Sequence, residues 1–248
     1  MKLEVVRIPG MEQDLVGLRY TPNSEPKPTA LVMAHGFTSG KYSLDHLAGY
    51  LAGRGYEALT FDLVGHKLGA TGGAMARTEQ AAENMRDALA WMRSRTLAAN
   101  LVLVGHSMGA AAALQAAAWD LQERSAPPVV GLICLCMGLE PARGFDSQIG
   151  QTMLAQRSDY VVGAPPLELL TGLDRLLEAA RHLDALPTLL IAAKQDVLLT
   201  VERVEALAAQ IGPNAAVTAL DSTHLEAPDR ARGTIANWLD RLPSLSNL

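Results

Sequence analysis

The residues Gly105-His106-Ser107-Met108-Gly109 place a serine between two glycines, directly after the apolar run Leu101–Val104 and before an alanine-rich stretch. The spacing fits the pattern G-x-S-x-G, which forms a sharp turn with an exposed serine hydroxyl when a strand precedes it and a helix follows it. Side chains at either glycine position would collide with the neighbouring strand and helix. We therefore expect Ser107 to be presented as a nucleophile at the end of a buried strand.

A serine hydroxyl needs a base that removes its proton and an acid that orients the base. His224 and Asp196 can fill these roles, because each follows an apolar run typical of a strand and their order after Ser107 is the one known for this turn. Asp62 and Asp221 are alternative acids, but Asp62 ends a different strand and Asp221 lies only three residues before His224. The expected catalytic residues are Ser107, Asp196 and His224.

An acyl-transfer site also needs donors for the oxyanion that forms during attack. His35-Gly36-Phe37 ends the apolar run Leu31–Ala34, so we expect the backbone N–H groups of Phe37 and Met108 to supply them. The side chains of His35 and His106 are interpreted as structural hydrogen-bonding groups. No HExxH motif or other metal-ligand spacing occurs, so we expect neither a metal nor a cofactor.

Short apolar runs alternate with helical patterns along the chain, which is typical of an α/β fold with helices on both faces of a mostly parallel sheet. The predicted sheet has about eight strands, and the first two flank Pro9-Gly10 as an antiparallel edge. The predicted strands are Leu3–Ile8, Leu15–Tyr20, Leu31–Ala34, Glu57–Phe61, Leu101–Val104, Val129–Leu135, Thr188–Ala192 and Ala216–Leu220. Apolar spacings of three and four predict core-facing helices around Leu44–Leu51, Met85–Met92, Val204–Ile211 and Ile235–Leu242.

About 50 residues separate the strand that ends near Met137 from the one that begins at Thr188, more than a crossover helix needs. We expect residues 139–186 to form a small inserted cap over one end of the sheet, with residues 1–138 and 187–248 as the core domain. An ordinary helix with an irregular entry is the alternative. The candidate substrate-binding residues of the cap are Phe145, Asp146, Gln148 and Tyr160.

The 248 residues are 49% hydrophobic and 19% charged, a globular composition, and the net charge of −5 gives no reason to expect nucleic acid as a partner. The start of the chain does not resemble a signal peptide, and the longest apolar stretch, Val129–Leu139, is too short to insert in a membrane. Cys134 and Cys136 are interpreted as core side chains on one face of a strand. We expect a cytoplasmic protein; a homodimer remains open.

The segments HGF at 35–37, FDLVGH at 61–66 and GHSMG at 105–109, with the strand-terminal aspartate and the late histidine, resemble the α/β-hydrolase superfamily over nearly the whole chain. HGFTSGK and the single cap are similar to small bacterial carboxylesterases, including the feruloyl and cinnamoyl esterase branch, and to monoglyceride-lipase-like hydrolases. The resemblance implies a small-molecule ester substrate with a small to medium acyl or aryl-acyl group. Lys67, Lys194 and Thr223 stand where the family commonly has glycine, which leaves the substrate open.

Other activities share the same triad and stay open at this point. Serine peptidases and amidases, thioesterases and carbon–carbon bond hydrolases all use it. Dehalogenases and epoxide hydrolases are disfavoured, because their nucleophile in this family is an aspartate. A non-catalytic binding protein with the hydrolase fold is the remaining alternative, against which the intact Ser107, Asp196 and His224 speak.

Overall fold

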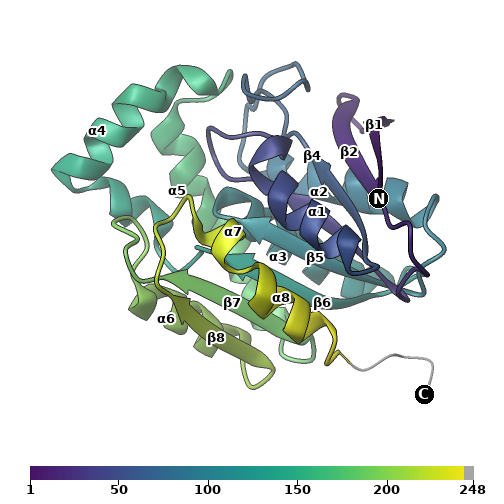
Figure 1. The fold of residues 1–248 in the computed structure, drawn as a ribbon. Coiled ribbons are helices and arrows are strands. Elements are labelled where there is room, and N and C mark those ends of the chain that lie inside the picture. Colours follow the sequence, from purple (N-terminus) through teal and green to yellow (C-terminus); the bar gives the residue numbers. More distant parts are fainter. Residues whose placement is uncertain (243–248) are drawn as a thin grey trace.

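The computed structural model describes residues 1–242, and one eight-stranded sheet runs through it (Figure 1). The strands lie in the order β1-β2-β4-β3-β5-β6-β7-β8; β1–β2 and β2–β4 pair antiparallel and all other pairs are parallel. The predicted sheet and its antiparallel edge are confirmed, with strand ends shifted by no more than two residues. The strands are β1 Lys2–Ile8, β2 Leu15–Thr21, β3 Thr29–Ala34, β4 Glu57–Phe61, β5 Asn100–His106, β6 Val129–Leu135, β7 Thr188–Ala193 and β8 Ala215–Leu220.

Helices cover both faces of the sheet, as expected for parallel strands that are buried on both sides. One face carries α2, α3 and α6, and the other carries α1, α7 and α8 (Figure 1). Two separate apolar clusters fill the two interfaces, and the predicted helix stripes point into them. The helices are α1 Asp45–Gly53, α2 Glu79–Arg93, α3 Met108–Glu123, α6 Val201–Ile211, α7 Ala227–Arg230 and α8 Arg232–Leu239.

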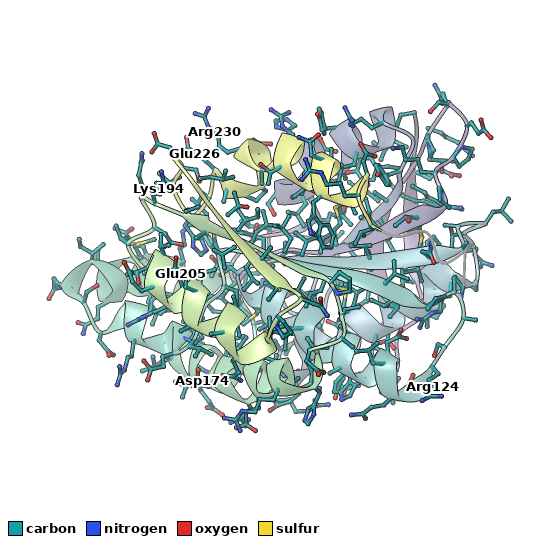
Figure 2. All side chains as sticks on the ribbon, turned by 90° about the horizontal axis from the view of Figure 1, so that it is seen from below. Arg124, Asp174, Lys194, Glu205, Glu226 and Arg230 are labelled. Carbon is teal, nitrogen blue, oxygen red and sulfur yellow. The ribbon has the colours of Figure 1, made fainter. Side chains whose placement is uncertain are left out.

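The carboxyl ends of the parallel strands meet at one edge of the sheet. Ala34 pairs with Gly105 and His106 pairs with Leu135, so the turns after β3, β5 and β6 are neighbours. Figure 2 places Lys194 and Glu226, from the loops after β7 and β8, near each other at this end, with Arg124 at the opposite end. In open α/β sheets this edge is where ligands bind.

The segment 139–186 connects β6 to β7 and has two unlike halves. Helix α5, Pro166–Leu177, packs against α3 and belongs to the core, whereas only Gly150 is buried in α4, Gln148–Arg157, which lies at the edge of the molecule (Figure 1). Between them, Val162 donates from its N–H to Gly65 O at 2.9 Å and accepts from Met75 N–H at 2.7 Å. The middle of the segment is thereby fastened to the loop after β4. Short 3₁₀ turns complete it at Pro141–Phe145, Ser158–Tyr160 and Glu178–His182.

Two further sequence predictions bear on the fold. The prediction that both cysteines share one strand face is wrong, because β6 ends at Leu135 and Cys136 has a φ of +50°, so the side chains join different clusters. The last residues of the predicted core domain, 243–248, lie outside the described residues. No helix in residues 1–242 is both long enough and apolar enough to cross a membrane.

Candidate functional site

Ser107 occupies a strained turn between β5 and α3. Its φ of 52° and ψ of −123° lie in a region that non-glycine residues seldom adopt, which is often a mark of a functional site. The turn is possible only because its neighbours are small: a Cβ on Gly105 would lie 2.1 Å from Gly109 O, and a Cβ on Gly109 would lie 2.2 Å from Ala34 O. Helix α3 therefore begins directly at the serine, with its positive end toward the side chain.

Asp196 and His224 lie in the loops after β7 and β8 and contact each other directly. His224 Nδ1 is 2.6 Å from Asp196 Oδ2, and Asp196 Oδ1 accepts the N–H groups of Leu198 and Leu199 at 2.9 and 3.0 Å. Burial opposes ionisation of this carboxyl, but the hydrogen bond to His224 and the two amides outweigh it and hold the pKa of Asp196 below its ordinary value. The group is an ionised carboxylate that fixes the imidazole.

Neither alternative acid contacts His224. Asp62 is fully buried at the end of β4, where it forms an ion pair of 2.6 Å with Lys41 Nζ and accepts the N–H groups of Lys41 and Ala70. Asp221 is exposed and accepts a hydrogen bond from Gln195 at 2.7 Å. Asp62 thus ties together the loops after β3 and β4, and Asp196 is left as the acid at the histidine.

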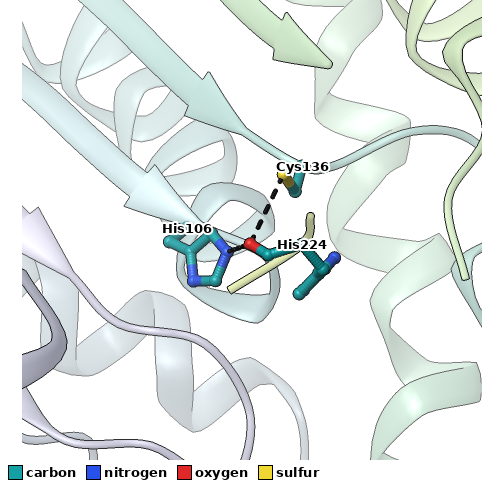
Figure 3. Close-up of side chains that lie close together, drawn as sticks. All are labelled: His106, Cys136 and His224. Carbon is teal, nitrogen blue, oxygen red and sulfur yellow. Dashed lines mark hydrogen bonds between the residues drawn. The ribbon is translucent and has the colours of Figure 1, made fainter. Parts of the chain in front are cut away.

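The backbone carbonyl of His224 is also held (Figure 3). His106 Nε2–H donates to it at 2.9 Å, and the Cys136 thiol points to it at 3.8 Å. Burial, with the nearby His224, lowers the pKa of His106 to about 3, so the ring stays neutral. The ligand atoms of the three residues lie within 4.8 Å of one another, as metal ligands could. Because His106 and Cys136 both direct a donor at one carbonyl, the cluster is accounted for as support for the His224 loop.

The loop after β3 lies against the serine. A Cβ on Gly36 would lie 3.1 Å from Ser107 Cβ, so the glycine permits this approach. The backbone N–H of Met108, at the first position of α3, has no acceptor within its own helix, and Phe37 N–H makes no hydrogen bond within residues 1–242. His35 fixes the loop: its Nδ1–H donates to Gly36 O at 2.8 Å and its Nε2 accepts Leu63 N–H at 3.0 Å.

Two compartments of a cleft meet at Ser107 and His224. The apolar compartment lies between the strand ends and the 139–186 segment, and the second, more polar compartment lies toward the loop after β3. The apolar walls include Met137, Phe145, Met153, Leu154, Leu170 and Leu173. The polar walls include Gly36, Ser39, Ser43, His106 and Pro228. Both compartments share Phe37, Ser107, Arg157, His224 and Leu225.

The four candidate substrate-binding residues have different positions. Phe145 lines the apolar compartment, whereas the exposed side chains of Asp146, Gln148 and Tyr160 are absent from the walls of both compartments within the described part of the chain. Tyr160 instead accepts Lys67 N–H at its carbonyl. The wall residues of the apolar compartment that the sequence analysis missed include Thr38, Met137, Pro141, Arg157, Leu170, Leu173, Leu198, Leu199 and Leu225.

The arrangement joins a half-buried hydroxyl, an imidazole, an ionised carboxylate and two backbone N–H groups that have no acceptor within residues 1–242, all beside an apolar cleft. Ser107 and His224 share the walls of both compartments, and the Ser107 hydroxyl makes no hydrogen bond within residues 1–242. It is therefore free to turn toward His224 when a substrate binds, because such contacts often tighten only in the complex. This is the set of groups that acyl transfer requires.

The sheet order, the strained serine turn and the loops at the strand ends define the class of α/β hydrolases. Residues 25–164 match the family model Hydrolase_4, described as serine aminopeptidase, S33, which covers more than half of the chain. The chain belongs to this family, and it is a hydrolase.

Solved structures share the fold at low sequence identity. The Pyrococcus furiosus esterase Pf2001 is 17% identical, with a TM-score of 0.77 over 98% of this chain and 92% of that one. The α/β hydrolase GrgF from Penicillium sp. is 17% identical, with a TM-score of 0.73 over 98% and 99%. The thioesterase domain of the curacin biosynthetic pathway is 18% identical, with a TM-score of 0.65 over 96% and 98%. The sequence has no significant match among the curated proteins compared with it.

Proposed function

We propose that the chain is a serine carboxylesterase that uses Ser107 as nucleophile, His224 as base and Asp196 as the acid that orients it. The observation that carries the proposal is the 2.6 Å contact between His224 Nδ1 and Asp196 Oδ2, on a histidine that shares the cleft walls with the strained Ser107. A carboxylate on Nδ1 leaves Nε2 unprotonated and able to accept the serine proton.

The reaction proceeds through an acyl-enzyme. His224 Nε2 takes the proton of Ser107 as its oxygen attacks the ester carbonyl, and the N–H groups of Phe37 and Met108 stabilise the oxyanion. The imidazolium then protonates the leaving alcohol. A water molecule, deprotonated by the same histidine, attacks the acyl-enzyme and releases the carboxylic acid together with the free serine.

The shape and polarity of the cleft favour neutral acyl groups. Methionine, phenylalanine and leucine side chains dominate the walls of the apolar compartment, which favours the hydrocarbon part of an acyl or aryl-acyl group. We further propose that, of the expected cap at residues 139–186, the part before α5 covers the site, with Phe145, Met153 and Leu154 as part of the acyl wall. Asp146, Gln148 and Tyr160 lie outside these walls and have no part in the proposed acyl site.

A serine aminopeptidase is the second candidate, since the matching family carries that description. An aminopeptidase needs a negative charge to bind the amino terminus of its substrate, yet no aspartate or glutamate lines either compartment within residues 1–242. The walls present an arginine instead. The positive charge of this arginine would repel a substrate's amino terminus, which supports an esterase over an aminopeptidase. Thioesters stay alternative substrates, because their acyl part is the same as that of esters.

The proposal is tested by labelling and by rates. A fluorophosphonate should label the wild-type protein and not Ser107→Ala, and p-nitrophenyl butyrate should be hydrolysed while an aminoacyl anilide is not. Ser222→Ala is a matched control, because Ser222 is buried in the loop after β8 and does not line the cleft. Hydrolysis of the anilide alone would establish the peptidase, and failure of Ser107 to label would refute a serine hydrolase.

A further inference from the structure

Arg157, the last residue of α4, is the one charged side chain on the walls of the cleft within the described residues, and it lines both compartments. It is half-buried, and its Nη1 lies 3.5 Å from Thr38 Oγ1, at the outer limit of a hydrogen bond. Thr38 follows Phe37, whose N–H is a proposed oxyanion donor. The positive charge is therefore close to the reacting centre.

The other half-buried arginines have partners for their guanidinium groups: Arg203 and Arg232 donate to backbone carbonyls, and Arg86 lies over the Trp119 ring. Arg19 pairs with Glu57, and Arg93 pairs with Asp120, both at sites where the side chains are mostly buried. Within residues 1–242 no carboxylate forms an ion pair with Arg157. A guanidinium that has lost part of its water without gaining a partner is costly, and a bound anion removes that cost. Its planar fork matches a carboxylate with two parallel hydrogen bonds.

The polar compartment is the place for this anion. Its walls carry the hydroxyl groups of Ser39 and Ser43 and contain no acidic side chain in the described part of the chain, whereas the walls of the other compartment are mainly apolar. With the acyl group in the apolar compartment and the ester carbonyl at Ser107, the alcohol part of the substrate extends into the polar one. A carboxylate on the alcohol would then face Arg157 and the two hydroxyls.

On the basis of the proposed function, we propose that Arg157 makes the enzyme selective for esters whose leaving alcohol carries a carboxylate. The reaction is unchanged: the acyl group passes to Ser107, the hydroxy acid leaves with a proton from His224, and water releases the acyl group. Arg157 binds the substrate and takes no part in proton transfer.

Two esters of similar shape and different charge test the proposal. These are 4-butanoyloxybenzoate and 4-butanoyloxybenzamide, with each kcat/KM divided by the rate of hydrolysis in buffer alone. The wild type should prefer the benzoate by at least about tenfold, since hydrogen bonds to charged groups are worth that much. In Arg157→Gln the ratio should fall to near one through a higher KM for the benzoate, and Arg157→Lys should restore part of it. Arg143→Gln is the matched control, because Arg143 is exposed and pairs with Glu140.

A binding measurement separates this inference from the proposed function. Calorimetric titration of Ser107→Ala with 4-hydroxybenzoate should show an affinity that falls at least tenfold when Arg157→Gln is added. If the wild type hydrolyses both esters at equal normalised rates, or Arg157→Gln keeps the preference or the affinity, the carboxylate inference is wrong and the esterase stands. If neither ester is hydrolysed and Ser107 is not labelled, the esterase is wrong, and the titration alone decides whether Arg157 binds the anion.

Discussion

The role of Asp196 in orienting His224 can be tested by a single substitution that keeps the size of the side chain. Asparagine in its place can keep an oxygen toward the N–H groups of Leu198 and Leu199, but it presents an amide to Nδ1 and favours the wrong tautomer of His224. We expect Asp196→Asn to lower kcat for p-nitrophenyl butyrate by about 10⁴-fold while the thermal midpoint changes little. The control is Asp221→Asn, which removes only an exposed acid. Near-full activity of Asp196→Asn would exclude it as the orienting acid.

The positions of Ser107, Asp196 and His224 could be predicted because each follows an apolar run, and strand ends meet at one edge of a parallel sheet. The cleft walls could not be predicted in the same way. Leu170 has the helical spacing of a core side chain, yet it also reaches the cleft, since α5 packs against α3 with one side and faces the site with another. Arg157 gave no signal, because a charged residue at a helix end is usually solvated.

At the scale of elements, the approach of α3 to β3 decides whether the nucleophile turn can form. A Cβ on Gly109 would meet backbone atoms of Ala34 and His35 at 2.2 to 2.6 Å, and neither can move without displacing a central strand. We expect Gly109→Ala to lower the free energy of unfolding in urea by about 3 kcal/mol, as overpacking in a core does, and to abolish labelling of Ser107. Gly233→Ala, with nothing within 4 Å of the new Cβ, should be neutral or stabilising by up to about 1 kcal/mol. Equal stabilities of the two variants would contradict this account.

The extent to which an element is buried determines how well the sequence predicted it. The central strands β3 and β5 are buried along nearly their whole length and therefore read as unbroken apolar runs. Helix α4 buries only Gly150, so its sequence has no apolar stripe from which its orientation could be inferred. For this reason the side-chain directions of Asp146 and Gln148, just before and at its start, could not be foreseen.

At the scale of the whole molecule, three buried histidines make stability depend on pH. Burial lowers the pKa of His35 to about 4 and, together with the neighbouring His35, that of His66 to about 3; burial lowers that of His106 to about 3. In the unfolded chain these groups titrate near 6.5. At a pH between the folded and unfolded pKa values, the unfolded state binds protons that the folded state does not bind. The contribution of the neutral histidines to the free energy of unfolding is therefore fully present above about pH 6.5 and is lost as the pH falls toward 4.

The expected size of this loss is large enough to measure. Each histidine contributes a slope of about 1.4 kcal/mol per pH unit, so three contribute about 4 kcal/mol per unit between roughly pH 6 and pH 4. Urea unfolding across this range should show the slope, and His66→Gln should reduce it by about a third. His46→Gln is the control, because His46 is 73% exposed. A flat profile would mean that the buried histidines take up protons in the folded protein.

Backbone hydrogen bonds hold residues 160–164 against the loop after β4, and they separate the 139–186 segment into a part that packs in the core and a part that lines the cleft. The buried leucines of α5 follow residues 160–164 in the chain, and α4, with its single buried glycine, precedes them. Mutations in α4 can therefore accumulate with little penalty to folding, while Met153, Leu154 and Arg157 still face the cleft. Substitution of α4, in evolution or by protein engineering, can therefore change which substrates fit the cleft. The core domain would keep its structure.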